Sequence, residues 1–357
     1  MILTLELLFN SPQIISAVID RVQQAGQDRI VWKNYLEFEQ TLSRTFKTYL
    51  GTTQGVVMGS VIDKNSQKPI RERRSIGSGV GEVAYLGNSY QLDNERLDII
   101  QQLINKFNSA GEGQPAVLNE IIGFLADDIR QCTLAPHKRM DYVVGQLLST
   151  GKAEVKLGDN PNGIELIDLE IPVMKKQAQS ADKNNFITYL KNLADELRSK
   201  VGTYGVIAMT RSTFNKRITA SKEFQNSYKM LLGSAEIGLS GGLISDKMAS
   251  TLFTGIGLPA IQLVDVFVQK EDGGVANVFA DERIAFLPAG KVGKMKWYMP
   301  YEATDRVPTK NYTMLEGGHF IATKRTEEGR FIEYGCEWLP DIANPHKITI
   351  VDTSTMG

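Results

Sequence analysis

Few residues in this chain have the types and spacing that catalysis requires. The three histidines, His137, His319 and His346, lie far apart, and none is spaced with another ligand-type residue as metal ligands on one helix face would be. We expect each to be a surface or hydrogen-bonded structural residue. The sequence has neither a G-x-S-x-G nucleophile motif nor a G-x-x-x-x-G-K-[ST] phosphate loop. It therefore predicts no catalytic residue, no metal ligand and no cofactor.

The nearest approach to a cofactor site is the glycine run Gly77-Ser-Gly-Val-Gly81, which resembles half of a dinucleotide-binding fingerprint. Glu82 stands where the third glycine belongs, and residues 63–75 are polar and charged where a buried strand should precede the run. A phosphate site needs a strand, a tight turn and then a helix N-terminus. We therefore expect a hairpin or extended loop here, and keep a nucleotide-binding enzyme only as an alternative.

A basic run forms the best candidate for contact with a second copy of the chain. Arg71, Arg73 and Arg74 lie together in a polar stretch. Arginine binds carboxylates through two parallel hydrogen bonds, so we expect these three side chains to meet acidic residues of an adjacent subunit. The alternative is a solvated loop tip that contributes nothing.

An apolar stripe near the N-terminus is the second candidate contact. Ser11 and Pro12 are typical of a helix start, and Ile14, Ile15, Val18, Ile19 and Val22 then follow at helical spacing. A helix of about a dozen residues is marginal alone in water, so this one must pack on its own domain or on another subunit. Ile15 and Ile19 are the inter-subunit candidates.

Composition bounds the class of protein. The chain has 357 residues, which favours two or three domains. Lys plus Arg is 40 and Asp plus Glu is 41, so the net charge is -1, which argues against a dedicated nucleic-acid binder. No apolar run is long enough to span a membrane. Two cysteines are too few for a disulfide scaffold, so synthesis in a reducing, intracellular compartment fits best.

The N-terminal half predicts the elements that must position these residues. Residues 30–50 are aromatic-rich and indicate an extended arm with little core of its own. Strands at 55–62 and 80–86 predict a long two-stranded projection, which is poorly stable alone. From Asp93 to Lys152 the pattern is helical, with a kink or restart at Pro136 and a stop at Gly151.

The rest of the chain mixes strands and helices. Strands at 152–157 and 164–173 are expected to pair, and a helix at 187–202 leads to a strand at 204–209 and a helix start at Thr210. A strand is expected at 260–269, and the last third is strand-rich. We expect these return strands to pair with those after the long helix. Residues 179–277 would then be an insertion.

This order resembles the major capsid proteins of tailed bacteriophages, an α+β fold also called Hong Kong 97-like, and is closest to the branch of the lambda-like capsid protein E. Four segments carry the resemblance: residues 139–152, where a long helix enters a strand; Tyr204 to Phe214, where a strand enters a Ser-Thr-Phe helix start; Phe286 to Gly290 with Gly293; and Tyr334-Gly-Cys-Glu-Trp338.

The resemblance implies four parts: an N-terminal arm at 1–50, an extended loop at 51–92, a peripheral domain with a spine helix at 93–178 and 278–357, and an axial domain at 179–277. It implies a structural, non-enzymatic protein that forms hexamers and pentamers of an icosahedral head, assembled in the host cytoplasm. The implied partners are portal, scaffold and decoration proteins and, non-specifically, double-stranded DNA, with no membrane. If a scaffold is used, the resemblance implies that it is a separate protein. A shell that encloses cargo protein, as in encapsulins, is the main alternative.

Overall fold

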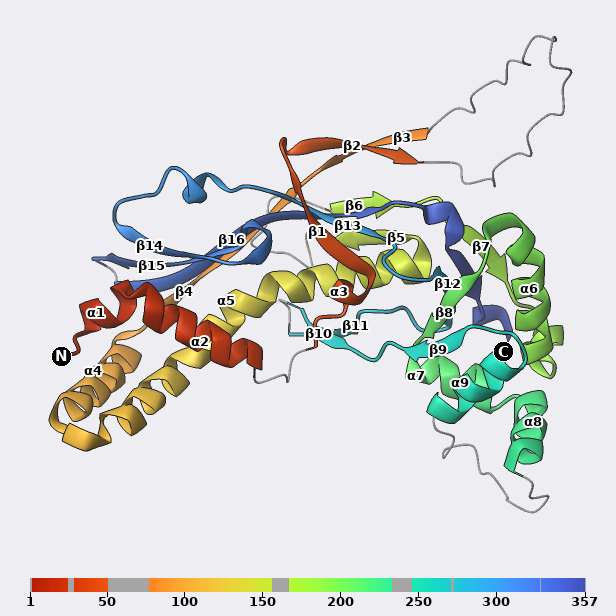
Figure 1. Ribbon diagram of the computed structural model, residues 1–357, viewed down its shortest axis with the longest axis horizontal. Helices are drawn as coiled ribbons and strands as arrows, with labels where there is room; N and C mark the ends of the chain where they lie inside the picture. The colour runs from red at the N-terminus through yellow and green to blue at the C-terminus, as the bar shows by residue number, and fades with distance from the viewer. Residues whose placement is uncertain are drawn as a thin grey trace, which may run out of the picture. The chain divides into compact units, whose positions relative to one another are not determined.

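The computed structural model describes residues 2–24, 29–50, 77–155, 167–232, 246–270, 273–327 and 329–356. The chain divides into two compact units (Figure 1). Unit 1 is drawn from Met1–Phe46, Gly81–Asp141 and Met295–Pro340. Unit 2 is drawn from Lys47–Val80, Tyr142–Lys294 and Asp341–Gly357.

Within the described residues, unit 1 combines five α-helices, one of them the first part of a longer helix, with a six-stranded sheet. Its helices are α1 (Leu5–Asn10), α2 (Pro12–Gln24), α4 (Asn94–Ser109) and the first part of α5 (Gln114–Thr150), with the short α3 (Trp32–Tyr35). Its strands are β1 (Leu36–Thr41), β4 (Ala84–Leu92), β13 (Gly293–Tyr298), β14 (Lys310–Met314), β15 (Phe320–Thr326) and β16 (Gly329–Ile342). The strand order is β1-β13-β16-β15-β14, and β4 pairs with β16.

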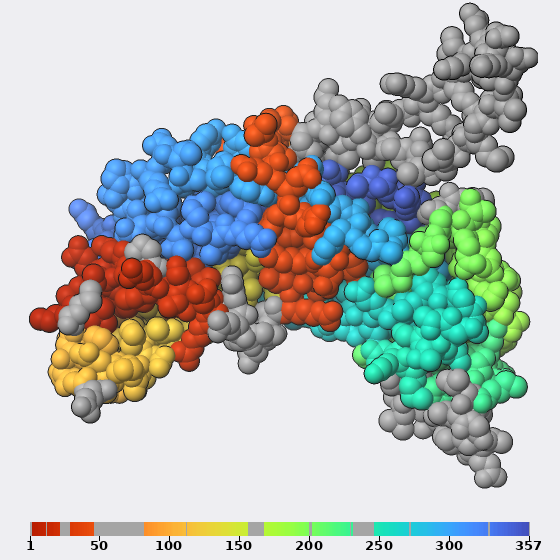
Figure 2. All heavy atoms as spheres, viewed as in Figure 1, coloured from red at the N-terminus to blue at the C-terminus, as the bar shows by residue number. Residues whose placement is uncertain are grey.

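The helices and the sheet of unit 1 share one apolar core. Along β15 and β16, alternate residues such as Ile321 and Ile332 turn to the same face, as the two-residue period of a strand requires. That face packs with buried residues of α1, α2, α4 and α5. In Figure 2 the red atoms of α1 and α2 lie directly against the amber atoms of α4 and the start of α5.

Helix α2 packs within its own chain. Ile15 and Ile19 are 3% and 2% exposed, and both belong to the core shared with α4 and α5. Of the two alternatives for the apolar stripe, the structure supports packing on the helix's own domain. Intrachain neighbours already bury the surface of Ile15 and Ile19, and an inter-subunit role for these two residues stays a prediction.

Ile19→Asp is expected to unfold unit 1 rather than merely prevent assembly. A buried, unpaired carboxylate costs several kcal/mol, so we expect the free energy of unfolding to fall by at least about 3 kcal/mol. Urea unfolding followed by circular dichroism measures this. Ala17→Asp, at an exposed position of the same helix, should change little. A fully stable Ile19→Asp subunit that fails only to assemble would restore the inter-subunit interpretation.

A kink or a restart was expected at Pro136; helix α5 runs through it as one element of 37 residues, so it does not restart there. Proline has no N–H to donate to the carbonyl four residues earlier, which here belongs to Cys132. The buried side chain of His319 donates a hydrogen bond to that carbonyl instead. Helix α5 ends where expected, because Gly151 takes the left-handed conformation (φ 78°) that favours glycine.

An aromatic cluster occupies the region where an arm with little core was expected. Trp32 and Trp338 are at most 1% exposed, and their ring centroids lie 6.1 Å apart. The Trp32 indole N–H donates to Nδ1 of His137 at 3.2 Å. The carboxylate of Asp141 accepts hydrogen bonds from the backbone N–H groups of Val31 (2.7 Å) and Trp32 (2.8 Å). The expectation is wrong because residues more than 100 positions away in the sequence cover this segment.

The two buried histidines predict that acid destabilises unit 1. Burial lowers the pKa of His319 to about 4 and lowers that of His137 well below its usual value. The unfolded chain therefore binds more protons on these rings than the folded chain does. As a result, the free energy of unfolding decreases as pH falls below about 6.5. Burial raises the pKa of Asp141 to about 6, which acts in the opposite sense between pH 6 and its ordinary value of 3.8.

Below pH 6, the unfolded chain binds two more protons on the histidines, and the folded chain binds one more on Asp141. The net difference of one proton lowers the free energy of unfolding by roughly 1.4 kcal/mol for each pH unit of acidification. The urea midpoint of the purified chain should thus be lower at pH 5 than at pH 7. A His319→Gln variant should show a shallower pH dependence. A midpoint that rises on acidification would contradict this balance.

Unit 2 is built around a five-stranded sheet in the order β7-β17-β12-β8-β9. These strands are β7 (Met174–Gln177), β8 (Tyr204–Met209), β9 (Ala260–Leu263), β12 (Arg283–Pro288) and β17 (Thr349–Asp352). Its helices are α6 (Phe186–Val201), α7 (Arg211–Thr213), the π-helical turn Phe214–Thr219, α8 (Lys222–Leu232) and α9 (Asp246–Gly255). Three two-stranded pairings complete the strands: β2 (Thr45–Leu50) with β3 (Gly77–Glu82), β5 (Lys152–Val155) with β6 (Ile167–Glu170), and β10 (Phe267–Gln269) with β11 (Val275–Asn277).

The core of unit 2 lies between this sheet and its helices. Phe186 and Leu190 of α6 and Phe253 of α9 are fully buried, and they pack with Ile207 of β8 and Phe286 of β12. The short helices Ser180–Lys183 and Ser354–Met356 lie beside each other at the edge of this unit. As expected, the Thr210 hydroxyl caps the helix after β8 by accepting from the Thr213 N–H at 3.1 Å.

The strand pairing differs from the sequence expectation in two places. The return strand β16 pairs antiparallel with β4, and not with β5 or β6, which pair with each other. Strands β8 and β9, which fall within residues 179–277, lie in the same sheet as β12 and β17, with β8 between β9 and β12. The two compact units have other bounds than the four expected parts, and the division at 50, 92, 178 and 277 stays a prediction. The expected strand at 260–269 is interrupted after Leu263.

Candidate assembly surface

The structure does not bring the predicted site residues together. Ile15 and Ile19 are in the core of unit 1. Arg71, Arg73 and Arg74 lie outside the described residues, so their role in binding a neighbouring subunit stays a prediction. The glycines at 77–81 form strand β3, which pairs with β2 and is followed by β4 rather than by a helix. The geometry of a phosphate loop is therefore not present at this run.

A group of exposed aromatic and apolar side chains instead lies on unit 1, where β1 turns into β2. We call it the Arg44 patch; its members are Leu42, Arg44, Tyr85, Tyr298, Tyr301 and Glu337. Leu42 is 96% exposed, Tyr301 61% and Tyr85 50%. In Figure 2 the end of β1 and the following turn, in orange-red, lie at the surface beside the blue strands of residues 295–340.

Backbone pairing places the members of the patch next to one another. Thr41 at the end of β1 donates through its hydroxyl to the carbonyl of Trp297 on β13 at 3.2 Å, which holds the turn beside Tyr298. Tyr85 on β4 stands directly opposite Glu337 on β16. The Tyr85 side chain lies over Gly87 and Gly335: a Cβ at Gly87 would come within 3.0 Å of the ring, and a Cβ at Gly335 within 2.5 Å of the hydroxyl oxygen. Glycine at these two positions leaves room for the ring on the sheet face.

Arg44 connects the patch electrostatically. Its guanidinium forms a 2.7 Å ion pair with Glu337, which is only 3% exposed. It also lies over the rings of Tyr301, at 5.1 Å from the centroid, and Tyr298, at 5.7 Å. The hydrogen bond to Glu337 raises the pKa of Arg44, and burial raises that of Tyr85 to about 12. With their pKa values raised, Arg44 stays charged and Tyr85 stays neutral at neutral pH.

Protein–protein interfaces are enriched in tyrosine and arginine, and the residues that contribute most binding energy are often of these types. The Arg44 patch has this composition, together with a leucine that is almost fully exposed. Sequence reasoning missed it because its members come from four separate segments. The one local signal was Leu42, an apolar residue in the polar stretch Thr41-Leu-Ser-Arg-Thr45.

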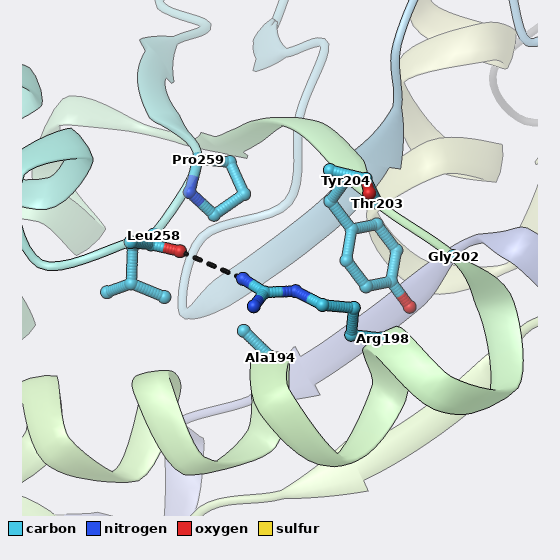
Figure 3. Close-up of a pocket in the computed structure, with 8 residues that line it drawn as sticks. Ala194, Arg198, Gly202, Thr203, Tyr204, Leu258 and Pro259 are labelled. Carbon is cyan, nitrogen blue, oxygen red and sulfur yellow. Dashed lines mark hydrogen bonds between the residues drawn. The ribbon is translucent and has the colours of Figure 1, made fainter.

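A pocket on unit 2 shows no catalytic arrangement. It has a volume of about 170 Å³ and is lined by Ala194, Arg198, Tyr204, Leu258 and Pro259 among others (Figure 3). Arg198 donates to the Gly257 carbonyl at 3.4 Å. Within the described ranges, no group of three His, Cys, Asp or Glu side chains is placed to hold a metal ion. In the same ranges, none of the helices has the length and apolar character needed to cross a membrane.

Comparison with solved structures identifies the fold. A protein assigned as the capsid protein of a prophage of E. coli CFT073 superposes with a TM-score of 0.53, over 94% of this chain and 98% of that one, at 10% sequence identity. A phage-related protein from Bordetella bronchiseptica RB50 gives a TM-score of 0.51 over 98% of both chains at 8% identity. The chain has the fold of phage capsid proteins.

This result confirms the α+β, capsid-type fold expected from the sequence. The procapsid of satellite phage P4 also matches, at 10% identity over 94% of this chain and 98% of that one, with a lower TM-score of 0.44. No protein-family model matches the sequence, and no curated protein matches it either. The capsid fold is thus recognised in structure at a level of identity where sequence comparison finds nothing.

Proposed function

We propose that this chain is the major capsid protein of a tailed bacteriophage, whose copies assemble as hexamers and pentamers into an icosahedral head around double-stranded DNA. The observation that carries this proposal is the likeness to the prophage capsid protein, which extends over 98% of that protein's length. A match of this extent covers a whole subunit and not only a common motif.

The Arg44 patch supports the proposal from the chain's own chemistry. A single contact of about 4 kcal/mol gives only millimolar affinity, but several contacts made at once by each subunit give a stable shell through effective concentration. The net charge of -1 is compatible with packing many copies together, because highly charged subunits would repel one another. We infer a structural role in the virion and no enzymatic one.

Sedimentation velocity of the purified chain at rising concentration tests the proposal. We expect a cooperative change from slowly sedimenting subunits to particles, with an absorbance ratio at 260 and 280 nm that shows nucleic acid in particles recovered from infected or induced cells. Particles that contain a protein cargo and no nucleic acid would instead establish the cargo-enclosing shell and refute the phage-head assignment.

A further inference from the structure

Two arginines of unit 1 lie directly opposite each other in the sheet. The antiparallel register of β15 and β16 pairs Arg325 with Arg330, so their side chains project from the same face. Like charges at directly opposite positions destabilise a sheet. Within the described ranges, neither guanidinium has a carboxylate at ion-pair distance.

Arg330 is the more constrained of the two. It is 9% exposed, and its guanidinium lies over the buried ring of Phe9, at 4.9 Å from the centroid. Burial, and then the charge of Arg325, lower the pKa of Arg330, while Glu6 acts in the opposite sense. Burying a cation without a carboxylate at ion-pair distance is unfavourable, whereas the buried Glu337 of the same unit is paired with Arg44.

The arginines line a polar cavity of about 310 Å³ whose walls are α1 and the strands β14, β15 and β16. Glu6 and Asn10 come from α1, and Asn311 and Thr323 come from the strands. Two hydrogen bonds hold the walls together: Thr323 Oγ1 donates to the Phe9 carbonyl at 2.8 Å, and Asn311 Nδ2 donates to Asn10 Oδ1 at 2.7 Å. The cavity is therefore formed before any ligand binds.

We propose that this Arg330 pocket binds the carboxylate of an acidic side chain from a second copy of the chain, an inference that rests on the proposed function. Arginine pairs with carboxylates through two parallel hydrogen bonds, and an incoming carboxylate would neutralise the charge shared by Arg325 and Arg330. The surface offers such groups, since Asp20, Glu95 and Asp98 are exposed and have no ion pair in the described ranges.

A phosphate backbone fits the pocket less well. Nucleic acid is bound by a row of cations that follows successive phosphates. The three cations that line this cavity, Lys324, Arg325 and Arg330, instead gather in one pocket with the carboxylate of Glu6, and Lys324 is already paired with Glu333 at 2.9 Å. The charge of Glu6 also predicts the direction in which a substitution at this residue changes binding. If the pocket takes a carboxylate from a neighbour, Glu6 repels it, and removing that charge must strengthen binding.

The test compares variants by the subunit concentration at which half of the protein sediments as particles. For Arg330→Met we expect this concentration to rise at least about tenfold, with a melting temperature at or above that of the unmodified chain because the like-charge pair is gone. For Glu6→Gln we expect it to fall. Arg306→Met, at an exposed arginine outside the pocket, should leave it unchanged.

Assembly of Arg330→Met at the unmodified concentration would overturn the inference while leaving the proposed function intact, because the unmodified chain would still form particles. Weaker assembly of Glu6→Gln would also overturn it, since Glu6 would then be the internal partner of Arg330. Normal Arg330→Met particles that lose affinity for a short DNA duplex would assign the pocket to phosphate and refute the carboxylate. If the unmodified chain forms no particles, it is the proposed function that fails.

Discussion

A chain carrying Leu42→Asp and Tyr301→Asp together should fold normally and form no particles. Both side chains are exposed in the subunit, at 96% and 61%, so neither substitution removes core packing. If the Arg44 patch is buried between subunits, each contact is worth about 1.5–3 kcal/mol, and a carboxylate in its place adds the cost of burying a charge. The subunit concentration needed for assembly should then rise by at least about 100-fold.

Leu42 and Tyr301 are better probes than Arg44 itself. Removing Arg44 would leave the carboxylate of Glu337, which is only 3% exposed, without its partner. Breaking a buried ion pair on one side costs about 3–5 kcal/mol, so a loss of particles could then reflect unfolding. The control is Ile2→Asp, which makes the same change at a residue of unit 1 that is 77% exposed and lies outside the patch.

Sedimentation velocity and thermal unfolding of the double variant and its control show whether the Arg44 patch is an interface between subunits. Particles at the unmodified concentration from the double variant would show that the patch is not an interface. Loss of particles from the Ile2→Asp control as well would show that any added surface charge prevents assembly, and the patch would have no special role.

Trp338→Ala is expected to remove most of the stability of unit 1. The ring is fully buried, and its centroid lies within 6.1 Å of those of Trp32, Phe38, His137 and His319. Truncating a buried tryptophan costs about 3–5 kcal/mol. The substitution also leaves the buried carbonyl of Gly317 without the hydrogen bond that it accepts from the Trp338 indole N–H at 2.7 Å. A whole domain is stable by only about 5–15 kcal/mol.

Urea unfolding followed by tryptophan fluorescence and circular dichroism measures the change in the free energy of unfolding. Trp338→Phe keeps an aromatic ring but has no N–H to donate, so its loss should be smaller than that of Trp338→Ala. If the free energy of unfolding of Trp338→Ala lies within about 1 kcal/mol of that of the unmodified chain, the aromatic cluster does not stabilise unit 1 as proposed.

Local pattern predicted most of the elements, because each depends on neighbours in the sequence. The periodicity of residues 114–150 marked a long helix, Gly151 its end, and Thr210 the cap of another. What failed depends on residues far apart in the chain. Helix α5 continues through Pro136. The Cys132 carbonyl, which the proline leaves without its helical donor, is bonded by His319, and no local pattern connects these positions.

The same reason explains the candidate surfaces. Tyr85 meets Glu337, and Arg325 meets Arg330, only through the registers of β4, β15 and β16. The apolar stripe with Ile15 and Ile19 was visible in the sequence, but the pattern of an amphipathic helix is identical whether its partner is intrachain or another subunit. Only the packing of α2 with α4 and α5 separates the two.

Electron microscopy of the purified chain, expressed alone and together with the genes that flank it, tests the central claim most directly. We expect closed shells whose surface lattice resolves into hexamers and pentamers of this subunit. Single folded subunits with no closed particle under either condition, at the highest soluble concentration, would contradict it.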